Sequence, residues 1–200
     1  MRTELFPKWL MYLIAFSCLP AASYAQQTSG VEVDVSASGT SRLKIALPAA
    51  VRAGELVDNQ GVTESIEQTL YRDLGLSGFF ELVPADRLLH DARAEGMTPR
   101  FSDYFNVGAQ AVIKVSYELK GSKSDKSSVV VDLQLFSVAT EQRIALEAPF
   151  DKPKQLAVSS VDVRRYTTLF ADEVIRHFTG SKGVFSSRLA VVKRSKRGKE

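Results

Sequence analysis

Cysteine and histidine are scarce in this sequence, and their scarcity argues against several kinds of site. The 200 residues include one cysteine, Cys18, and two histidines, His90 and His177. The two histidines stand alone, without the HExxH-like spacing of a zinc site. The sequence also lacks a GxSxG elbow, a P-loop and a GxGxxG motif after a predicted strand. It therefore predicts a protein with no metal, no cofactor and no catalytic activity, and only a triad assembled from distant residues would escape these checks.

Long apolar runs are also missing, except at the N-terminus. Trp9–Cys18 has the length of a signal-peptide core, and small residues follow it at Ser23 and Ala25. We expect a signal peptide over residues 1–25, cleaved after Ala25, and a periplasmic mature protein without cysteine. No later run has the roughly 20 apolar residues that a membrane-spanning helix needs.

Two other interpretations of the leader remain open. One is an uncleaved membrane anchor, although the apolar run is short for that role. The other is a lipoprotein acylated on Cys18. Ala15 and Phe16 fit poorly in the lipobox that such acylation requires, so the simple signal peptide is the preferred interpretation.

Positive charge is concentrated at the C-terminus. The formal net charge is +3, but residues 188–200 contain six basic residues and one acidic residue, so the remainder is near −2. A general nucleic-acid-binding protein carries its charge on a face of the fold, so no nucleic-acid partner is expected. The tail is interpreted as a solvated end, and the alternative is peripheral association with anionic groups of the envelope.

Hydrophobic periodicity predicts strands mixed with helices. The predicted strands are Val31–Val35, Leu43–Leu47, Phe79–Val83, Ala111–Leu119, Val129–Val138, Gln142–Phe150 and Leu189–Val192. The predicted helices are a segment that starts at Thr63 as N-cap and ends at Gly75, a short helix over Ala85–Glu95, a segment containing Phe101 and Tyr104, and the longest helix over Ser159–Phe178. The polar stretch Lys120–Ser128 joins two strands as a hairpin loop, and the adjacent acids Asp172 and Glu173 are interpreted as solvated surface. This order predicts an α/β layered domain around a mixed sheet.

The N-terminal strand is the main candidate for an interaction site. Val31–Val35 alternates apolar and acidic residues and lies between a polar segment and a Ser/Gly/Thr spacer. Such a segment can add a strand to the sheet edge of another protein. The alternative is an ordinary edge strand of its own sheet.

Several motifs along the chain carry a resemblance to a known family. They are Val31–Gly39 followed by Leu43–Pro48, Leu70–Leu74 followed by Ser77–Phe80 and Ala85–Arg87, Gly108–Ile113, and Ala171–Val174 followed by Thr179–Phe185 and Ser187–Ala190. In this order and spacing they resemble the N-terminal domain of the TolB family of the Tol-Pal envelope system. The resemblance covers residues 26–192.

The resemblance implies a three-layer α/β/α domain with a mixed sheet of about five strands, and a periplasmic protein that takes part in envelope maintenance and protein import. It also implies that the mature N-terminal segment binds the C-terminal domain of TolA. The matching residues here are Val31, Glu32, Val33, Asp34, Val35, Ser36, Ala37 and Ser38. The family's β-propeller, which binds the lipoprotein Pal, is not in this sequence, so Pal binding is not carried over. We expect either a piece of a longer chain or a stand-alone paralogue.

These interpretations divide the chain into four parts and leave more than one function open. The parts are a signal peptide (1–25), an extended segment and spacer (26–41), an α/β domain (42–187), and a basic tail or propeller start (188–200). The preferred function is a Tol-Pal adaptor. The alternatives are a periplasmic accessory lipoprotein of the LpoB-like or curli-assembly-like class, and an unrecognised hydrolase with a deep pocket.

Overall fold

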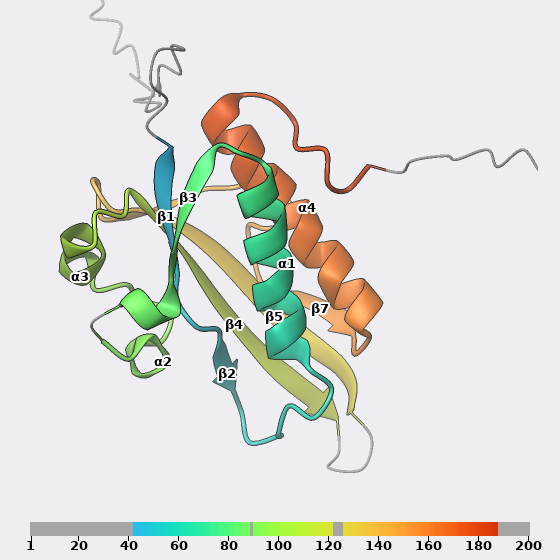
Figure 1. Ribbon diagram of the computed structural model, residues 1–200. Helices are drawn as coiled ribbons and strands as arrows, with labels where there is room; N and C mark the ends of the chain where they lie inside the picture. The colour runs from blue at the N-terminus through green and yellow to red at the C-terminus, as the bar shows by residue number, and fades with distance from the viewer. Residues whose placement is uncertain (1–41, 89, 122–125, 188–200) are drawn as a thin grey trace, which may run out of the picture. The chain divides into compact units, whose positions relative to one another are not determined.

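A mixed β-sheet forms the centre of the computed structural model, which describes residues 42–88, 90–121 and 126–187 (Figure 1). The strands are β1 (Leu43–Leu47), β2 (Val51–Ala53), β3 (Phe80–Pro84), β4 (Ala111–Gly121), β5 (Lys126–Ser137), β6 (Gln142–Ile144) and β7 (Lys154–Ala157). Their order is β3-β1-β4-β5-β6, with β2 paired to β4 and β7 paired to β5. The seven strands form a sheet that is five strands wide, because β1 and β2 both pair with β4 on one side, and β6 and β7 both pair with β5 on the other. The prediction of a mixed sheet of about five strands is confirmed.

The long hairpin β4–β5 forms the middle of the sheet. The two strands pair antiparallel from Ala111 opposite Ser137 as far as Gly121 opposite Lys126. The predicted hairpin is therefore confirmed, and its strands extend further into the polar stretch than the alternation indicated. β1 and β2 both run parallel to β4 along one edge, while β6 and β7 run antiparallel to β5 along the other.

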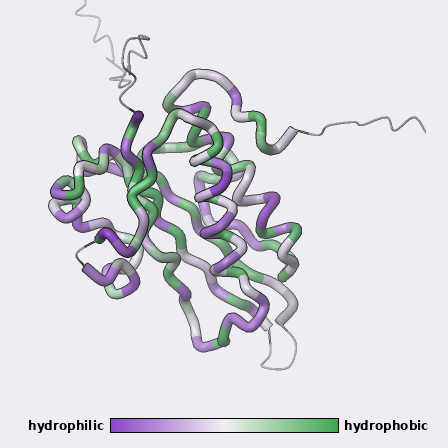
Figure 2. The backbone as a smooth tube through the Cα atoms, in the orientation of Figure 1, coloured by the Kyte–Doolittle hydropathy of each residue, from purple (hydrophilic) through white to green (hydrophobic). Residues whose placement is uncertain are grey.

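Two long helices cover one face of the sheet (Figure 1). They are α1 (Val62–Leu76) and α4 (Ser160–Thr179). Their buried stripes recur at helical spacing, as predicted, and pack against the inward side chains of β4 and β5 to form the main core. Figure 2 shows apolar and polar residues alternating along both helices, as expected for amphipathic helices. A buried Asp73 joins the two helices, accepting hydrogen bonds from Thr168 at 2.8 Å and from Arg72 at 2.7 Å.

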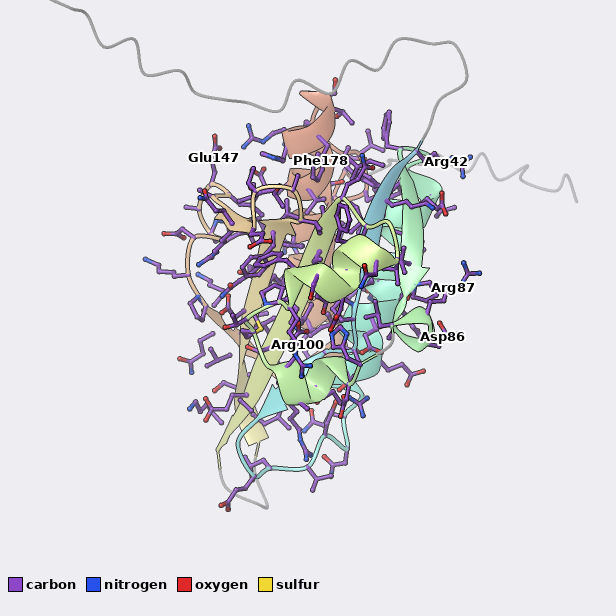
Figure 3. All side chains as sticks on the ribbon, turned by 90° about the vertical axis from the view of Figure 1, so that its left-hand side faces the viewer. Arg42, Asp86, Arg87, Arg100, Glu147 and Phe178 are labelled. Atoms are coloured by element: carbon purple, nitrogen blue, oxygen red, sulfur yellow. The ribbon has the colours of Figure 1, made fainter. Side chains whose placement is uncertain are left out.

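A thinner layer covers the opposite face, which Figure 3 views directly. It consists of the 3₁₀ turn η2 (Ala85–Arg87) and the short helices α2 (Ala92–Glu95) and α3 (Phe101–Asn106). In Figure 3, Arg100 lies between the two short helices, and Asp86 and Arg87 point outward. A second apolar cluster lies beneath this layer, with Tyr104, Val112 and Phe136 among its buried members. The three-layer α/β/α architecture is thus confirmed.

Several local predictions were wrong in ways that have physical explanations. Thr63 is not the N-cap of α1, because Gly61 occupies that position and the Thr63 hydroxyl binds Asp58 instead. Gly75 lies inside α1. Only Gln142–Ile144 of the predicted strand 142–150 is extended, and the chain then turns before β7.

Two further corrections concern predicted surface and helix residues. The segment 85–95 is not one helix, because the 3₁₀ turn ends at Arg87 and α2 begins only at Ala92, after its N-cap Asp91. Asp172 is not solvated surface. It is 4% exposed and binds two backbone N–H groups. The predicted strands 31–35 and 189–192 lie outside the described residues.

Candidate functional site

The predicted contact segment, Val31–Ser38, lies outside the described residues, but the structure shows the strand that follows it. Leu43 begins β1, and its N–H donates to the Phe79 carbonyl at 3.1 Å. The next residue, Lys44, accepts from the Gln110 N–H at 2.8 Å and donates its own N–H to the Gln110 side chain at 3.1 Å. β1 is therefore held on both sides within two residues of its start. Arg42, labelled in Figure 3, precedes this anchored strand.

β1 lies inside the sheet, with β3 on one side and β4 on the other, and it pairs parallel with both. Interior strands are the least free to fray, because both rows of backbone hydrogen bonds are used. A contact segment that precedes β1 is therefore followed by a strand that is paired on both sides.

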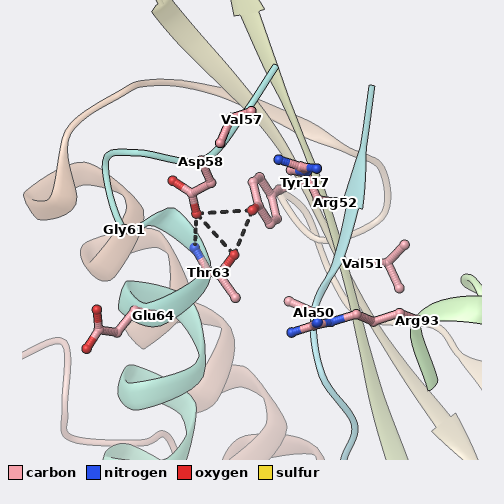
Figure 4. A pocket seen from close by; sticks show the side chains of 10 residues that line it. All are labelled: Ala50, Val51, Arg52, Val57, Asp58, Gly61, Thr63, Glu64, Arg93 and Tyr117. Atoms are coloured by element: carbon pink, nitrogen blue, oxygen red, sulfur yellow. Dashed lines mark hydrogen bonds between the residues drawn. The ribbon is translucent and has the colours of Figure 1, made fainter. Parts of the chain in front are cut away.

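A hollow of about 520 Å³ opens between the start of α1 and strand β2 (Figure 4). Asp58 is one of the residues that line it, and one carboxylate oxygen accepts from the Thr63 N–H at 2.8 Å and from the Thr63 hydroxyl at 3.0 Å. The Tyr117 hydroxyl lies 3.1 Å from the same oxygen and 2.6 Å from the Thr63 hydroxyl. The other oxygen accepts from the Val62 N–H at 3.1 Å.

This arrangement caps α1 from a distance. Its first N–H groups have no partner within the helix, and Asp58 supplies acceptors to two of them. Partial burial raises the pKa of the Asp58 carboxyl, but hydrogen bonds from the backbone of Thr63 and Val62 and from the Thr63 and Tyr117 hydroxyls outweigh it. They lower the pKa to about 2. A carboxylate that is so fully engaged is poorly placed to act as a base, so the hollow is interpreted as a structural cap.

A second polar cluster lies under the short helices. Lys114 of β4 is fully buried, and its ammonium group lies 2.8 Å from a carboxylate oxygen of Glu95, whose side chain is 1% exposed. The same oxygen accepts from the Tyr104 hydroxyl at 2.7 Å and lies 3.2 Å from His90 Nε2. The other His90 ring nitrogen lies 3.2 Å from an Asp103 carboxylate oxygen.

The directions in which the pKa values of Glu95 and Tyr104 move agree with a closed ion pair. Burial raises the pKa of the Glu95 carboxyl, but the hydrogen bonds from Lys114, Tyr104 and the Arg100 backbone lower it below its usual value. Burial and the Glu95 carboxylate together raise the pKa of the Tyr104 hydroxyl. Glu95 is thus held ionised by its neighbours, and its hydrogen-bonding capacity is used to attach α2 and α3 to the sheet.

Sequence reasoning missed both clusters. Asp58 stands in the predicted loop before a helix, and an acidic residue five positions before Thr63 was the available signal. Lys114 stands within an apolar strand, where a lysine is unusual and calls for a buried partner.

Residues 42–88, 90–121 and 126–187 contain neither a metal-binding cluster nor a membrane-spanning helix. No group of three or more His, Cys, Asp or Glu side chains there is arranged to hold a metal ion. Within the same ranges, no helix combines the length and the apolar composition needed to cross a membrane.

Comparisons with known proteins agree with this geometry. The family model of the TolB amino-terminal domain matches residues 31–144. A Tol-Pal system protein TolB from Syntrophotalea carbinolica is 28% identical over 92% of this chain, and one from Geobacter sulfurreducens is 24% identical over 96%. Each match spans 40% of the relative, so the chain spans less than half the length of these curated relatives. The crystal structure of TolB from Acinetobacter baumannii superimposes with a TM-score of 0.50 at 19% identity, covering 72% of this chain and 30% of that one.

The fold is that of a three-layer α/β/α domain. The polar clusters around Asp58 and Glu95 mainly hold the elements of this domain together. Four residues separate its expected contact segment from the interior strand β1. The chain belongs to the TolB amino-terminal domain family, and the two relatives described above are named as Tol-Pal system proteins.

Proposed function

We propose that this chain is a periplasmic adaptor of the Tol-Pal system, which contributes to outer-membrane maintenance and protein import by binding a TolA-like C-terminal domain through Val31–Ser38. The observation that carries the proposal is the start of the family match at Val31, eleven residues before the first described residue, Arg42. The match covers the proposed contact segment together with the part of the α/β body up to Ile144.

The alternation of the segment suits strand addition. Val31, Val33 and Val35 fall on one side of an extended chain, while Glu32 and Asp34 fall on the other. In strand addition, backbone hydrogen bonds to the partner's sheet edge supply affinity, and pockets for alternate side chains supply specificity. The valines suit an apolar groove, and the two acids favour a basic rim on the partner.

The anchoring of β1 gives this contact a mechanical role. A partner that pulls on residues 31–38 would load β1 directly, and β1 is hydrogen-bonded to both β3 and β4. The load is therefore shared by the centre of the sheet. This suits a connector that transmits force or position between envelope components.

The proposal includes no catalytic step. The acids at the centre of the two clusters, Asp58 and Glu95, each accept several hydrogen bonds. Among the described residues that line the hollow around Asp58 there is no histidine or cysteine. Binding, with no reaction, is the function that this arrangement supports best.

Calorimetric titration tests the proposal. A chain that starts at Gln26 is titrated into a TolA C-terminal domain beside a chain that starts at Ser41, and a chain that ends at Val192 controls for the basic tail. We expect binding by the first and third chains and none by the second. Equal binding by the chain from Ser41 would move the contact into the folded domain, and the absence of binding by all three would overturn the choice of partner.

A further inference from the structure

The chain does not leave the domain directly from the end of α4. Gly180, with φ of 70°, ends the helix in the left-handed region, and its N–H donates to the Arg176 carbonyl at 2.9 Å. The Thr179 hydroxyl accepts from the Ser181 N–H at 3.2 Å. The following residues then turn back along the outside of α4 (Figure 1). We call residues 180–187 the strap.

Asp172 binds the strap from the middle of α4. One of its carboxylate oxygens accepts from the Phe185 N–H at 3.0 Å, and the other accepts from the Ser186 N–H at 2.8 Å. Asp172 is 4% exposed. Aspartate has a low helix propensity, and a buried carboxylate is costly unless its oxygens are bound. The two N–H groups of the strap offset the cost of burying the carboxylate.

Gly183 allows the strap to approach the helix this closely. A Cβ atom at Gly183 would lie 2.2 Å from the Asp172 carboxylate and 2.5 Å from the Asp172 Cα. The second distance involves backbone, which no side-chain rotation can relieve. Glycine is therefore required here by the close approach of the strap to the helix.

The strap also has an inner and an outer side. Phe185 is partly buried and packs against the main core, while Val184 is 68% exposed. A turn closes the strap at its end, where the Ser187 N–H donates to the Val184 carbonyl at 3.1 Å. The strap is thus held by two hydrogen bonds to the Asp172 carboxylate and by the apolar contact of Phe185, and Gly183 lets it lie close to α4.

We propose that Asp172 and Gly183 form a clamp that fixes the position at which the chain leaves the domain, at Ser187. Without the clamp, the seven residues after Gly180 could reach about 25 Å in any open direction, at roughly 3.5 Å for each residue. With the clamp closed, Ser187 stays beside α4. The inference concerns the exit of the chain and is independent of the partner proposed for Val31–Ser38.

Pulsed spin-label distance measurements test the clamp. Labels are placed through Gln68→Cys on the exposed face of α1 and Ser187→Cys at the end of the strap, in a chain from Gln26 that has no other cysteine. We expect a narrow distance distribution. Asp172→Ala is expected to broaden it, while Asp162→Ala, at an exposed acid of the same helix, is expected to leave it narrow. Circular dichroism verifies that each variant is folded.

Gly183→Ala and amide exchange keep the proposal testable if Asp172→Ala fails to fold. Gly183→Ala is expected to broaden the distribution while the acid remains in place. In the unmodified chain, the Phe185 and Ser186 amides should exchange about tenfold to hundredfold more slowly than the exposed Lys182 amide, as expected for hydrogen bonds to a charged group. A narrow distribution in the folded variants, or unprotected Phe185 and Ser186 amides, would overturn the clamp.

Discussion

The two faces of the sheet are covered in different ways, and neighbouring residues of β4 show the contrast. Ile113 points into the main core under α1 and α4, a large cluster of buried apolar side chains. Lys114, the next residue, points to the opposite face and is equally buried, but it meets Glu95. The long helices bury enough apolar surface to stay in place. The short helices α2 and α3 are too short to be stable alone and depend on the second apolar cluster and on a buried ion pair.

The largest expected effect on stability comes from breaking the ion pair between Lys114 and Glu95, on the face covered by α2 and α3. Lys114→Met leaves the Glu95 carboxylate buried without its cation, and we expect it to lower the free energy of unfolding by about 3–5 kcal/mol. Urea unfolding at pH 7 measures the change. Adding Glu95→Gln should recover part of the loss, because the unpaired charge is then gone. A loss below about 1 kcal/mol for Lys114→Met would show that the pair does not hold the short helices.

A comparable loss of stability is expected on the face covered by α1 and α4, but there no second substitution that removes a charge can restore it. Leu70 is 2% exposed in the main core, and Leu70→Ala should cost about 2–5 kcal/mol through lost burial and a residual cavity. Leu76 lies on the same helix and is 71% exposed. Leu76→Ala should change stability by about 0.5 kcal/mol or less. Similar losses at the two positions would contradict the assignment of the buried stripe.

A smaller effect is expected at Asp58, the carboxylate that caps the start of α1. Asp58→Asn should cost about 1 kcal/mol at pH 7, because a neutral amide accepts weaker hydrogen bonds than a carboxylate and offers one accepting oxygen where the carboxylate offers two. The folded pKa of about 2 lies below the ordinary 3.8, so the stabilisation is full above about pH 4. It should be lost as the pH falls from about 4 toward 2.

Thermal unfolding at several pH values measures this dependence. The difference in stability between the parent and Asp58→Asn should shrink over that interval. Asp151→Asn, at an exposed aspartate, serves as the control and should show no such trend. A difference that stays constant down to pH 2 would mean that the Asp58 carboxylate is not the capping group.

The smallest expected effect is a gain. Gly75 lies within α1, and a Cβ atom there would lie 3.7 Å from Leu82, an ordinary contact. Gly75→Ala should therefore stabilise the protein by about 0.5–1 kcal/mol, because alanine favours the helix. Gly78 has a φ of 78°, so Gly78→Ala should destabilise it instead. Melting temperatures of the two variants test the opposite signs.

The same contrast explains how much of the structure the sequence predicted. Regular alternation predicted β1, the hairpin and the stripes of α1 and α4, because each pattern reports burial against one large apolar face. The strands β2 and β7 were missed, since they have three and four residues and are extended mainly because β4 and β5 offer them partners. Strands of three or four residues contain too few alternating positions to be recognised from the sequence.

Buried polar residues were the other failure, because their partners are distant in the sequence. Glu95 is 19 positions from Lys114, and Asp172 is 13 and 14 positions from the two amides that it binds. From the sequence alone, Asp172 and Glu173 resemble two solvated acids on a helix. Only the structure shows that the strap returns and donates two backbone N–H groups to Asp172. The contact segment 31–38 remains a prediction from the family resemblance.

The most direct test of the proposed adaptor is a residue-by-residue NMR titration. An ¹⁵N-labelled chain from Gln26 is mixed with an unlabelled TolA C-terminal domain, and the amide shifts are followed. We expect large amide shift changes at Val31–Ser38, smaller changes at the start of β1, and no change at the short helices α2 and α3. Changes confined to the folded domain, with unchanged resonances at residues 31–38, would contradict it.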